Sequence, residues 1–392
     1  MPKQKLLIIS NLYPNSAEPT RGIFTKQIAE HLIDKYDIKV IAPLPWAPKW
    51  AKKLVASPVD VPFFEQIDNI DVYHPRYFVI PKIGRSLYGF FFFAGILLTL
   101  LKLQREFKPD LINVHWIYPD GFGAVLAAKL LGLSIVTHSL GCDINEYSKY
   151  FLRRQLIKYT LKNADRNIVV SDALKTKCIE LGASADKTTV ILNGVNNSIF
   201  FNRDKLELRK QLALPSETKI FLYAGNFNIE KGLCYLIEAY SMLSKNQSNI
   251  MLCVVGSGPL EQEINGQINS LGIGDTVKLC GRVPHSDIPL YLGAADFLCL
   301  PSLREGCPNI VLEALASGTP VLSSRVGAVP DVLASAEVPL GLMATPENSV
   351  ELASIMEKAL TMDWQVRENF QWMNWHDNAD RIAEVFDESV SR

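Results

Sequence analysis

Two glutamates, Glu305 and Glu313, are the residues whose type and spacing best suggest chemistry. Seven residues separate them, and the intervening turn leads into an apolar run from Ile310 to Ala316. We expect a helix to begin near Pro308 or Asn309, since proline suits the first helical position. The free N–H groups and the positive dipole end of such a helix form a ready site for phosphate.

Glu313 would lie about one turn into this helix among apolar neighbours, where a buried carboxylate needs hydrogen-bond partners. Vicinal sugar hydroxyls are suitable partners, and Glu305, on the loop side of the turn, is placed to reach a second sugar. One ligand accounts for all these features: a nucleotide-diphosphate sugar with ribose at Glu313, diphosphate at the helix start and hexose at Glu305. The alternative is a solvated loop glutamate beside the polar edge of an ordinary helix.

This stretch resembles the signature of glycosyltransferase family 4, whose members are retaining, nucleotide-sugar-dependent transferases. The signature is two glutamates separated by seven residues, read here as Glu305-Gly306-x-Pro308 through Glu313-Ala314. The resemblance implies the GT-B fold, an α/β architecture with two Rossmann-like, doubly wound parallel-sheet domains facing across a cleft. It also implies a donor held by the second domain, an acceptor presented by the first, and transfer with the anomeric configuration retained.

Length and composition agree with two globular domains. The chain has 392 residues, 48% hydrophobic and 21% charged. Residues 1–190 carry 25 Lys and Arg against 17 Asp and Glu, so the first half is basic and the second acidic. A basic and aromatic segment in the first half is compatible with an anionic membrane surface, with nucleic acid or with plain solvation, and no nucleic-acid recognition motif accompanies it. Its residues are Trp46, Lys49, Trp50, Lys52, Lys53, Phe63, Phe64, Lys82 and Arg85.

The cysteines and the apolar segments indicate in which cellular compartment the protein is expected to fold. Seven scattered cysteines without metal-type spacing indicate a reducing, cytoplasmic environment and no metal cluster. The apolar run 6–9 is too short for the apolar region of a signal peptide and is interpreted as a strand. The longest uncharged run, 86–101, has 16 residues, fewer than the roughly 20 that a spanning helix needs. It predicts a buried or interfacial helix.

The first domain opens with a strand, a loop and a helix, a βαβ pattern that places ligands at the carboxyl ends of its strands. Gly22 would start the helix, and the resemblance implies that it lies near the donor diphosphate and the acceptor. Two further strands end at His115 and His138. Family members often carry a histidine directly before Gly-x-Asp; here Leu140 fills that position before Gly141-Cys142-Asp143.

We therefore consider two interpretations of this loop: either His138 takes the catalytic role near the reacting sugar, or that role is vacant. His115 is either an acceptor-side contact or a satisfied structural histidine, and Asp143 is placed on the acceptor side by the resemblance.

The second domain also opens with a strand and a glycine-containing turn, which ends at Lys231 and Gly232. A lysine at a helix start is disfavoured by the macrodipole unless it meets an anion. The family pattern pairs this lysine with an arginine on the diphosphate, but Asn226 fills the arginine position here, which leaves Lys231 as the main cation. Turns after the next two strands, with Gly256, Gly258, Arg282 and Val283, would line the nucleotide base.

The sequence thus predicts an acceptor-side domain over 1–195, a donor domain over 196–370, and a last helix over 371–392 that crosses back to the first domain. Glu305, Lys231 and His138 are the predicted catalytic residues. The predicted donor-binding residues are Gly22, Asn226, Gly256, Gly258, Arg282, Val283, Gly306, Cys307, Pro308, Asn309 and Glu313.

The predicted activity is retaining sugar transfer to a glycan or lipid-linked acceptor in bacterial surface polysaccharide synthesis. No cofactor or metal is expected, and peripheral contact with the inner membrane is compatible with the basic first half. Two alternatives remain: a sugar-nucleotide epimerase of the same fold, and a non-catalytic module that binds the donor without turnover.

Overall fold

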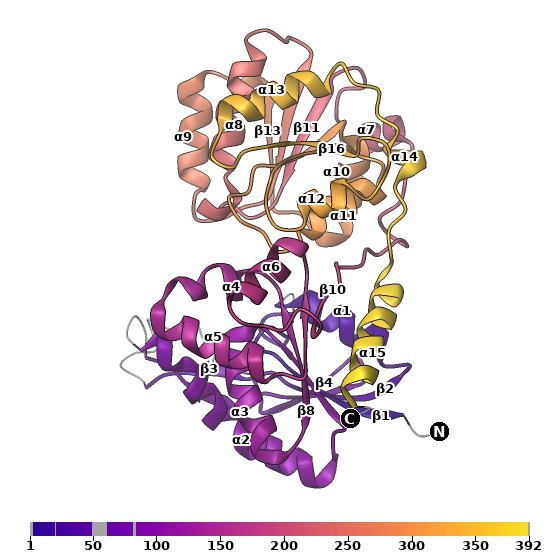
Figure 1. Cartoon of the computed structure of the whole chain (residues 1–392). Coiled ribbons are helices and arrows are strands. Elements are labelled where there is room, and N and C mark those ends of the chain that lie inside the picture. Colours follow the sequence, from indigo (N-terminus) through magenta and orange to yellow (C-terminus); the bar gives the residue numbers. More distant parts are fainter. Residues whose placement is uncertain (1–2, 20, 49–60, 81–83, 391–392) are drawn as a thin grey trace. The chain divides into compact units, whose positions relative to one another are not determined.

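The computed structural model describes residues 3–19, 21–48, 61–80 and 84–390 (Figure 1). The chain forms two compact units, the first combining Met1–Leu192 with Trp375–Arg392 and the second spanning Asn193–Asn374. Part of the basic and aromatic segment, namely Lys49, Trp50, Lys52, Lys53 and Lys82, lies outside the described residues. The membrane hypothesis built on those side chains stays a prediction.

The first unit is built on an eight-stranded sheet of order β10-β9-β8-β7-β1-β2-β5-β4, parallel except for the β4–β5 pair. Its strands are β1 (Gln4–Ile9), β2 (Tyr36–Ile41), β4 (Phe64–Ile67), β5 (Ile70–Tyr73), β7 (Leu111–His115), β8 (Ser134–Ser139), β9 (Arg166–Val169) and β10 (Thr188–Val190). A separate parallel pair is formed by β3 (Leu44–Trp46) and β6 (Arg76–Phe78).

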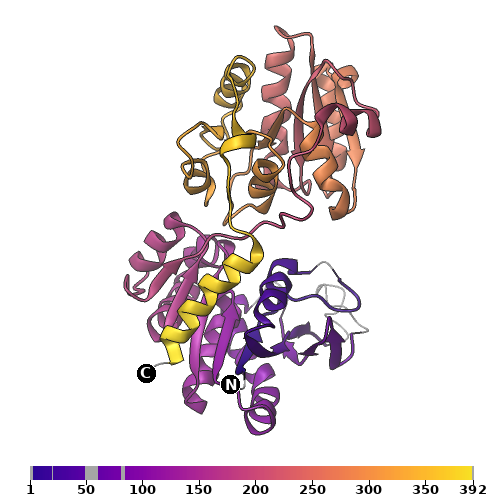
Figure 2. The ribbon, with the colours of Figure 1, turned by 90° about the vertical axis from the view of Figure 1, so that its right-hand side faces the viewer.

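Helices cover both faces of this sheet, which explains why the run 6–9 of its central strand β1 is apolar and buried throughout. In β1, Leu6 and Ile8 face one core with α1 and α15, while Leu7 and Ile9 face the other with α2 and α3. Figure 2 shows α15 lying along the first unit. The helices are α1 (Ile23–Leu32), α2 (Tyr88–Glu106), α3 (Phe122–Leu131), α4 (Cys142–Asn145), α5 (Phe151–Asn163), α6 (Asp172–Glu180) and α15 (Trp375–Val390).

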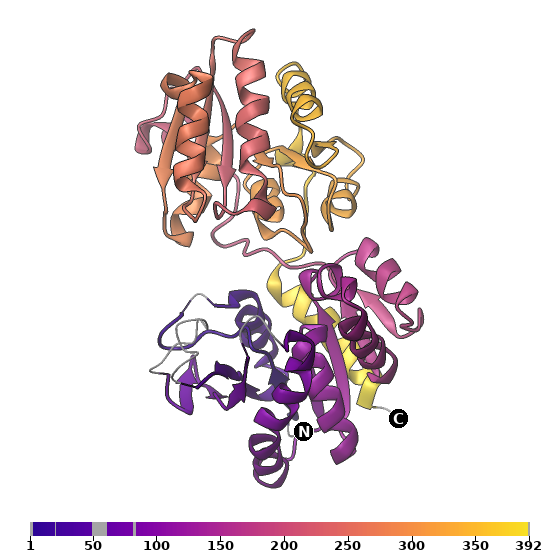
Figure 3. The same cartoon turned by 90° about the vertical axis from the view of Figure 1, so that its left-hand side faces the viewer.

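The second unit has a six-stranded, fully parallel sheet of order β13-β12-β11-β14-β15-β16 with helices on both sides (Figure 3). Its strands are β11 (Lys219–Ala224), β12 (Ile250–Val255), β13 (Val277–Gly281), β14 (Phe297–Leu300), β15 (Val321–Ser324) and β16 (Gly341–Ala344). Its helices are α7 (Lys205–Gln211), α8 (Leu233–Ser244), α9 (Glu261–Leu271), α10 (Ile288–Ala294), α11 (Asn309–Ala316), α12 (Val329–Leu333), α13 (Ser349–Ala359) and α14 (Val366–Asn369). Two doubly wound parallel-sheet units confirm the predicted fold class.

The chain enters and leaves the second unit along two neighbouring segments. The N–H of Val195 donates to the carbonyl of Met373 at 3.1 Å, and Val195 and Asn374 form an isolated parallel bridge. The indole Nε1 of Trp372 donates to the carbonyl of Asn193 at 2.9 Å. These bonds explain why residues 193–195 and 371–374 group with the second unit.

Helix α2 contains the long uncharged run of the sequence. With the turn before it, 85–106 is the one helix of the described chain that is long and apolar enough to cross a membrane, and 33% of that window is buried. Phe92, Ile96, Leu100 and Leu103 on its inner side belong to the core. Its outward residues follow at helical spacing: Leu87, Phe90, Ala94 and Leu98 are apolar, and Lys102 and Arg105 are basic.

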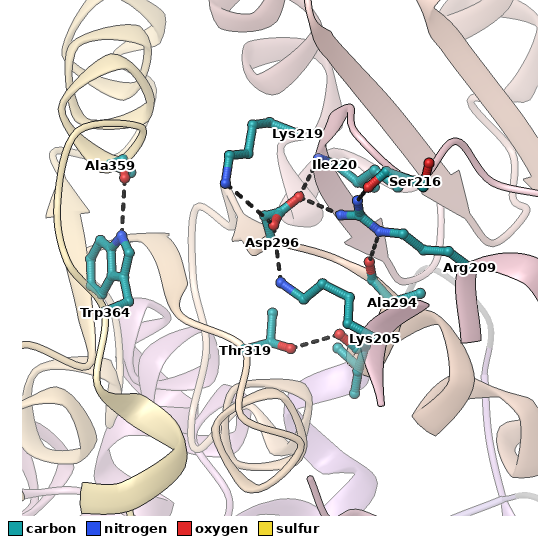
Figure 4. Close-up of polar contacts among 11 residues, drawn as sticks. Lys205, Arg209, Ser216, Lys219, Ile220, Ala294, Asp296, Thr319, Ala359 and Trp364 are labelled. Carbon is teal, nitrogen blue, oxygen red and sulfur yellow. Dashed lines mark hydrogen bonds and ion pairs between the residues drawn. The ribbon is translucent and has the colours of Figure 1, made fainter. Parts of the chain in front are cut away.

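The carboxylate of Asp296, directly before β14, contacts residues of α7 and β11 in the second unit (Figure 4). Its Oδ2 lies 2.6 Å from Arg209 Nη2 and accepts the N–H of Ile220, while its Oδ1 lies 3.0 Å from Lys205 Nζ. The buried Arg209 also donates Nε–H to the carbonyl of Ala294. This buried network holds α7 against the edge where β11 and β14 begin.

We expect Asp296→Asn to lower the free energy of unfolding by about 3 kcal/mol, because it leaves the buried Arg209 without its carboxylate. Burial raises the pKa of Asp296, but the charges and hydrogen bonds of Lys205, Arg209 and Ile220 outweigh it and hold the pKa below its usual range. The stabilising effect should therefore be complete above about pH 4 and be lost as the pH falls through the folded pKa. Urea denaturation from pH 7 downward measures both effects. Asp275→Asn, at an exposed aspartate, is the control, and equal midpoints for the two variants at pH 7 would contradict the assigned role.

Candidate functional site

The strongest cluster of predicted residues lies where the strand order of the second sheet reverses. Strands β11 and β14 are neighbours there, and ligands of doubly wound proteins bind at the carboxyl ends of such a pair. The loop after β11 carries Lys231, and the loop after β14 carries Glu305. The Nζ of Lys231 lies 2.7 Å from Oε1 of Glu305, with side chains 29% and 12% exposed. The structure thus joins two predicted catalytic residues in one shielded ion pair.

Backbone contacts hold these two loops together. Gly232 has a φ of +63°, and a Cβ on it would lie 2.2 Å from the carbonyl oxygen of Pro301. The N–H of Leu303 donates to the carbonyl of Glu230 at 2.8 Å. Only glycine allows the first loop to lie this close to the second, so Gly232 sets the position of Lys231.

The turn between the two glutamates leads into α11, which begins at Asn309 as the sequence predicts. No side chain caps this helix start. The Nδ2 of Asn193 donates to Oδ1 of Asn309 at 2.7 Å, and the N–H of Ala328 donates to the carbonyl of Gly306 at 2.7 Å. The loop 301–308 is therefore fixed from both sides, which preorganises the helix start for an anion.

Glu313 meets a residue that the sequence analysis did not single out. Its Oε1 lies 3.3 Å from Nε2 of His285, whose ring packs edge-on against Phe200 with centroids 5.7 Å apart. The hydrogen bond and charge of Glu313 raise the pKa of His285 above its ordinary value. The position of His285, directly after the predicted base-lining turn, was the signal available in the sequence.

The remaining predicted donor residues surround these pairs. Asn226 is exposed, and its carbonyl accepts a hydrogen bond of 2.9 Å from the hydroxyl of Tyr223. The N–H of Gly256 donates to the carbonyl of Gly281 at 2.8 Å, which links the turns after β12 and β13. Burial raises the pKa of the Cys307 thiol to about 12, so this cysteine is protonated at neutral pH and is no nucleophile. Within the same turns Gly258 is half-buried, Arg282 is exposed, Val283 is half-buried and Pro308 is buried.

In the first unit, His115 and His138 end the adjacent strands β7 and β8 and stack with ring centroids 4.8 Å apart. Both rings are buried, and within the described part of the chain none of their four nitrogens has a hydrogen-bond partner. His115 therefore lacks the bonds of a satisfied structural histidine. Burial lowers the pKa of His138 to about 4 and that of His115 well below its ordinary value. Both imidazoles are neutral at neutral pH.

Asp143 organises the loop that follows β8. Its Oδ1 accepts hydrogen bonds from Ser139 Oγ and from the N–H groups of Leu140 and Gly141, and its Oδ2 accepts from the N–H of Ile117. These bonds use both oxygens of a fully buried carboxyl group. Asp143 therefore holds the backbone of its own loop against the backbone that follows β7. The acceptor-side placement of Asp143 stays a prediction, and in the described structure the side chain holds the backbone of its loop.

Two further residues lie at the strand-order reversal of the first sheet, between β1 and β7. Asp120, which the sequence analysis missed, is buried and accepts the N–H of Asn11 at 2.6 Å, which ties the two loops together. Gly22 precedes α1 with a φ of +56°, and a Cβ there would lie 2.2 Å from the carbonyl oxygen of Leu12. The predicted Gly22 position therefore requires glycine.

Within the described residues, no group of three or more His, Cys, Asp or Glu side chains is arranged to hold a metal ion. The predicted sites divide between the units: Gly22, His115, His138 and Asp143 belong to the first, and Lys231, Glu305 and Glu313 belong to the second.

Two family models match the chain. The model for group 1 glycosyl transferases matches residues 204–372, and the model for glycosyltransferase family 4 matches residues 22–198. A Bacillus subtilis glycosyltransferase named for teichuronic acid biosynthesis, TuaC, is 30% identical over 361 residues, which cover 90% of this chain and 88% of the relative. These matches confirm the family resemblance found in the sequence.

Solved structures agree on the fold. Sucrose-phosphate synthase from Thermosynechococcus elongatus superposes with a TM-score of 0.79 at 21% identity, covering 98% of this chain and 99% of that one. The Anabaena protein HepE in complex with UDP-glucose superposes with a TM-score of 0.71 at 21% identity, covering 98% and 99%. Both are structural neighbours of GT-B type, which confirms the predicted architecture class.

We expect Glu313→Gln to lower the pKa of His285, because the hydrogen bond and charge of the carboxylate that raise it are removed while burial still lowers it. In the wild type the raised pKa means that the pair stabilises the fold below the unfolded pKa, and this contribution is lost as the pH rises through the folded value. NMR titration of the His285 ring measures the shift, with Glu305→Gln as the control. A His285 pKa that is the same in wild type and Glu313→Gln would show that the two side chains do not interact in solution.

Proposed function

The chain belongs to the glycosyltransferases of group 1 and family 4, and we propose that it transfers a sugar from a nucleotide-diphosphate sugar to a glycan or lipid-linked acceptor in surface polysaccharide synthesis. The observation that carries the proposal is the Lys231–Glu305 pair beside the uncapped start of α11. A cation and a carboxylate in contact, followed along the chain by an uncapped helix start, support binding of a phosphorylated sugar at the strand ends where doubly wound sheets bind ligands.

Donor binding would exchange the partners of these charges. The diphosphate would take Lys231 from Glu305, and Glu305 would then be free to orient the hydroxyls of the donor sugar. Likewise the ribose hydroxyls would meet Glu313 in place of His285. Each charged side chain is paired before the donor binds and would be paired again in the complex, so binding leaves none of them buried alone.

The chemistry would be a retaining, front-face transfer. As the bond between the sugar and the diphosphate breaks, negative charge develops on the leaving phosphate, where Lys231 and the α11 amides would stabilise it. The leaving phosphate would accept the proton of the acceptor hydroxyl as the new glycosidic bond forms on the same face. This scheme uses no metal ion. His138 is neutral, so any role beside the reacting sugar would be as a hydrogen-bonding group.

Relatives support the choice of donor and acceptor classes. TuaC is named for teichuronic acid biosynthesis, and HepE was solved with UDP-glucose. UDP-sugars are therefore the donors to test first, and lipid-linked glycans are the first acceptors.

We also propose that the outward stripe of α2 touches the cytoplasmic face of the membrane. Leu98 is 79% exposed, and Leu87 and Phe90 are exposed on the same face, followed by Lys102 and Arg105. Apolar side chains followed by cations on one helix face suit the boundary between acyl chains and anionic head groups. Such contact would bring the first unit to a lipid-linked acceptor.

The central experiment measures nucleoside diphosphate release from UDP-, GDP- and ADP-sugars with membrane-lipid extract as acceptor. We expect acceptor-dependent release with one donor class, unchanged by EDTA, and a product with retained configuration. Lys231→Ala should lower kcat/KM by about 10²- to 10³-fold, because it removes transition-state charge stabilisation. Glu313→Gln should act mainly on the donor KM, and Glu357→Gln, at an exposed glutamate of α13, is the control.

The alternatives give different results. Conversion of the donor to its epimer without acceptor would indicate the epimerase, and donor binding without turnover in any extract would indicate a binding module. If Lys231→Ala were as active as the control Glu357→Gln, the assignment of the donor site to Lys231 would be refuted.

For the membrane proposal, we expect the wild type to cosediment with vesicles containing anionic lipid and less with neutral vesicles. The double variant Phe90→Glu with Leu98→Glu should lose most of this binding, because two carboxylates would enter the apolar stripe. Leu130→Gln, which removes another exposed leucine on α3, should keep it. Equal binding by the two variants would refute the assignment to α2.

A further inference from the structure

Two thiols lie against each other in the second unit, on the strands that lead into the turns at Gly256 and Gly281. The Sγ atoms of Cys253 on β12 and Cys280 on β13 are 3.3 Å apart. Cys253 is buried, and Cys280 is partly exposed. A buried thiol in contact with an accessible one is the arrangement in which an oxidised outer cysteine can be captured by the inner one.

A break in strand pairing brings the thiols together. Val254 pairs with Leu279, but the next residue, Val255, pairs with Gly281, so Cys280 is an extra residue without a partner in the ladder. Such a bulge re-aims a side chain, here toward Cys253. Strand β13 is at the edge of the sheet, so its end can move with less resistance than the central strand β11.

The surroundings of Cys280 favour its thiolate. The hydrogen bond from Cys253 is the largest influence and lowers the pKa of Cys280, aided by the nearby ammonium of Lys278 and a side-chain contact with Tyr291 on α10, while partial burial opposes the shift. The hydrogen bond with Cys280 and burial raise the pKa of Cys253. Cys280 is thus the more acidic and the more accessible thiol of the pair, which makes it the one to react first.

We propose that Cys253 and Cys280 form a redox-sensitive dithiol that a hydroperoxide converts to a disulfide. The Cys280 thiolate attacks the peroxide oxygen, which gives the sulfenic acid and releases hydroxide or alkoxide. The Cys253 thiol then attacks the sulfenic sulfur, the S–S bond forms and water leaves. Both thiols are oxidised by two electrons in all, and the peroxide O–O bond is reduced.

Formation of the disulfide would change the proposed donor site by displacing the end of β13. Its sulfurs must approach by about 1 Å more to reach bonding distance. The bulge and the edge strand are the parts that can yield, and Gly281 at the end of β13 accepts the hydrogen bond of Gly256. Oxidation would therefore shift the turns 256–259 and 281–284 together and weaken nucleotide binding. This last effect rests on the proposed function, whereas formation of the disulfide does not.

The test uses the reduced full-length chain, treated with hydrogen peroxide and then alkylated. Peptide mapping without reductant should show a Cys253–Cys280 link that dithiothreitol reverses. In the untreated protein, Cys280 should react with iodoacetamide with a midpoint below the ordinary cysteine value of about 8.5. Cys253→Ala should slow that reaction about tenfold at pH 7 and leave a Cys280 sulfenic acid that dimedone traps. Partly exposed Cys234, whose pKa is raised, is the internal control.

Each outcome decides one part. Absence of the link, with Cys280 no more reactive than Cys234, would overturn the dithiol. Formation of the link with unchanged UDP and GDP affinity would overturn its coupling to the donor turns. Failure of both nucleotides to bind even the reduced protein would count against the proposed donor site alone, because the link is measured independently. A thermal melt of Cys253→Ala checks that the variant is folded.

Discussion

The ion pair between Lys231 and Glu305 is the interaction on which the second unit's candidate site depends. It joins loops that follow two strands far apart in the sequence, and each loop is built to allow it. Gly232 lets one loop lie against Pro301, and bonds from Asn193 and Ala328 fix the other. An ion pair this shielded is stabilising only because its geometry is good, and removal of either partner would leave a charge with little water around it.

The same constraint shapes the rest of the site. Glu313 is equally shielded and contacts the exposed ring of His285, so each glutamate of the signature has a basic side chain as its partner. A polyanionic ligand with many hydroxyl groups is the kind of molecule that can replace both partners at once. A simple anion would satisfy Lys231 and leave Glu305 unpaired. This difference agrees with the sugar nucleotide of the proposed function rather than with free phosphate.

The sequence predicted much of this arrangement, and the reasons are physical. Apolar runs such as 6–9 must be buried on both faces, and glycine and proline mark helix starts, so the two parallel sheets and the start of α11 were readable. Pairings across the sheet were not. Nothing in local pattern shows that Lys231 meets Glu305 or that His285 meets Glu313, because these contacts depend on which strands become neighbours. For the same reason the stacking of His115 on His138 and the internal role of Asp143 were missed.

The paired segments at Val195 and Met373 have a mechanical consequence. The chain passes between the units twice, and hydrogen bonds tie the two crossing segments into one paired ribbon. Asn193 belongs to this ribbon through Trp372 and also holds Asn309 at the start of α11. A change in the backbone of either crossing segment would therefore be transmitted through Asn193 to the first residue of α11.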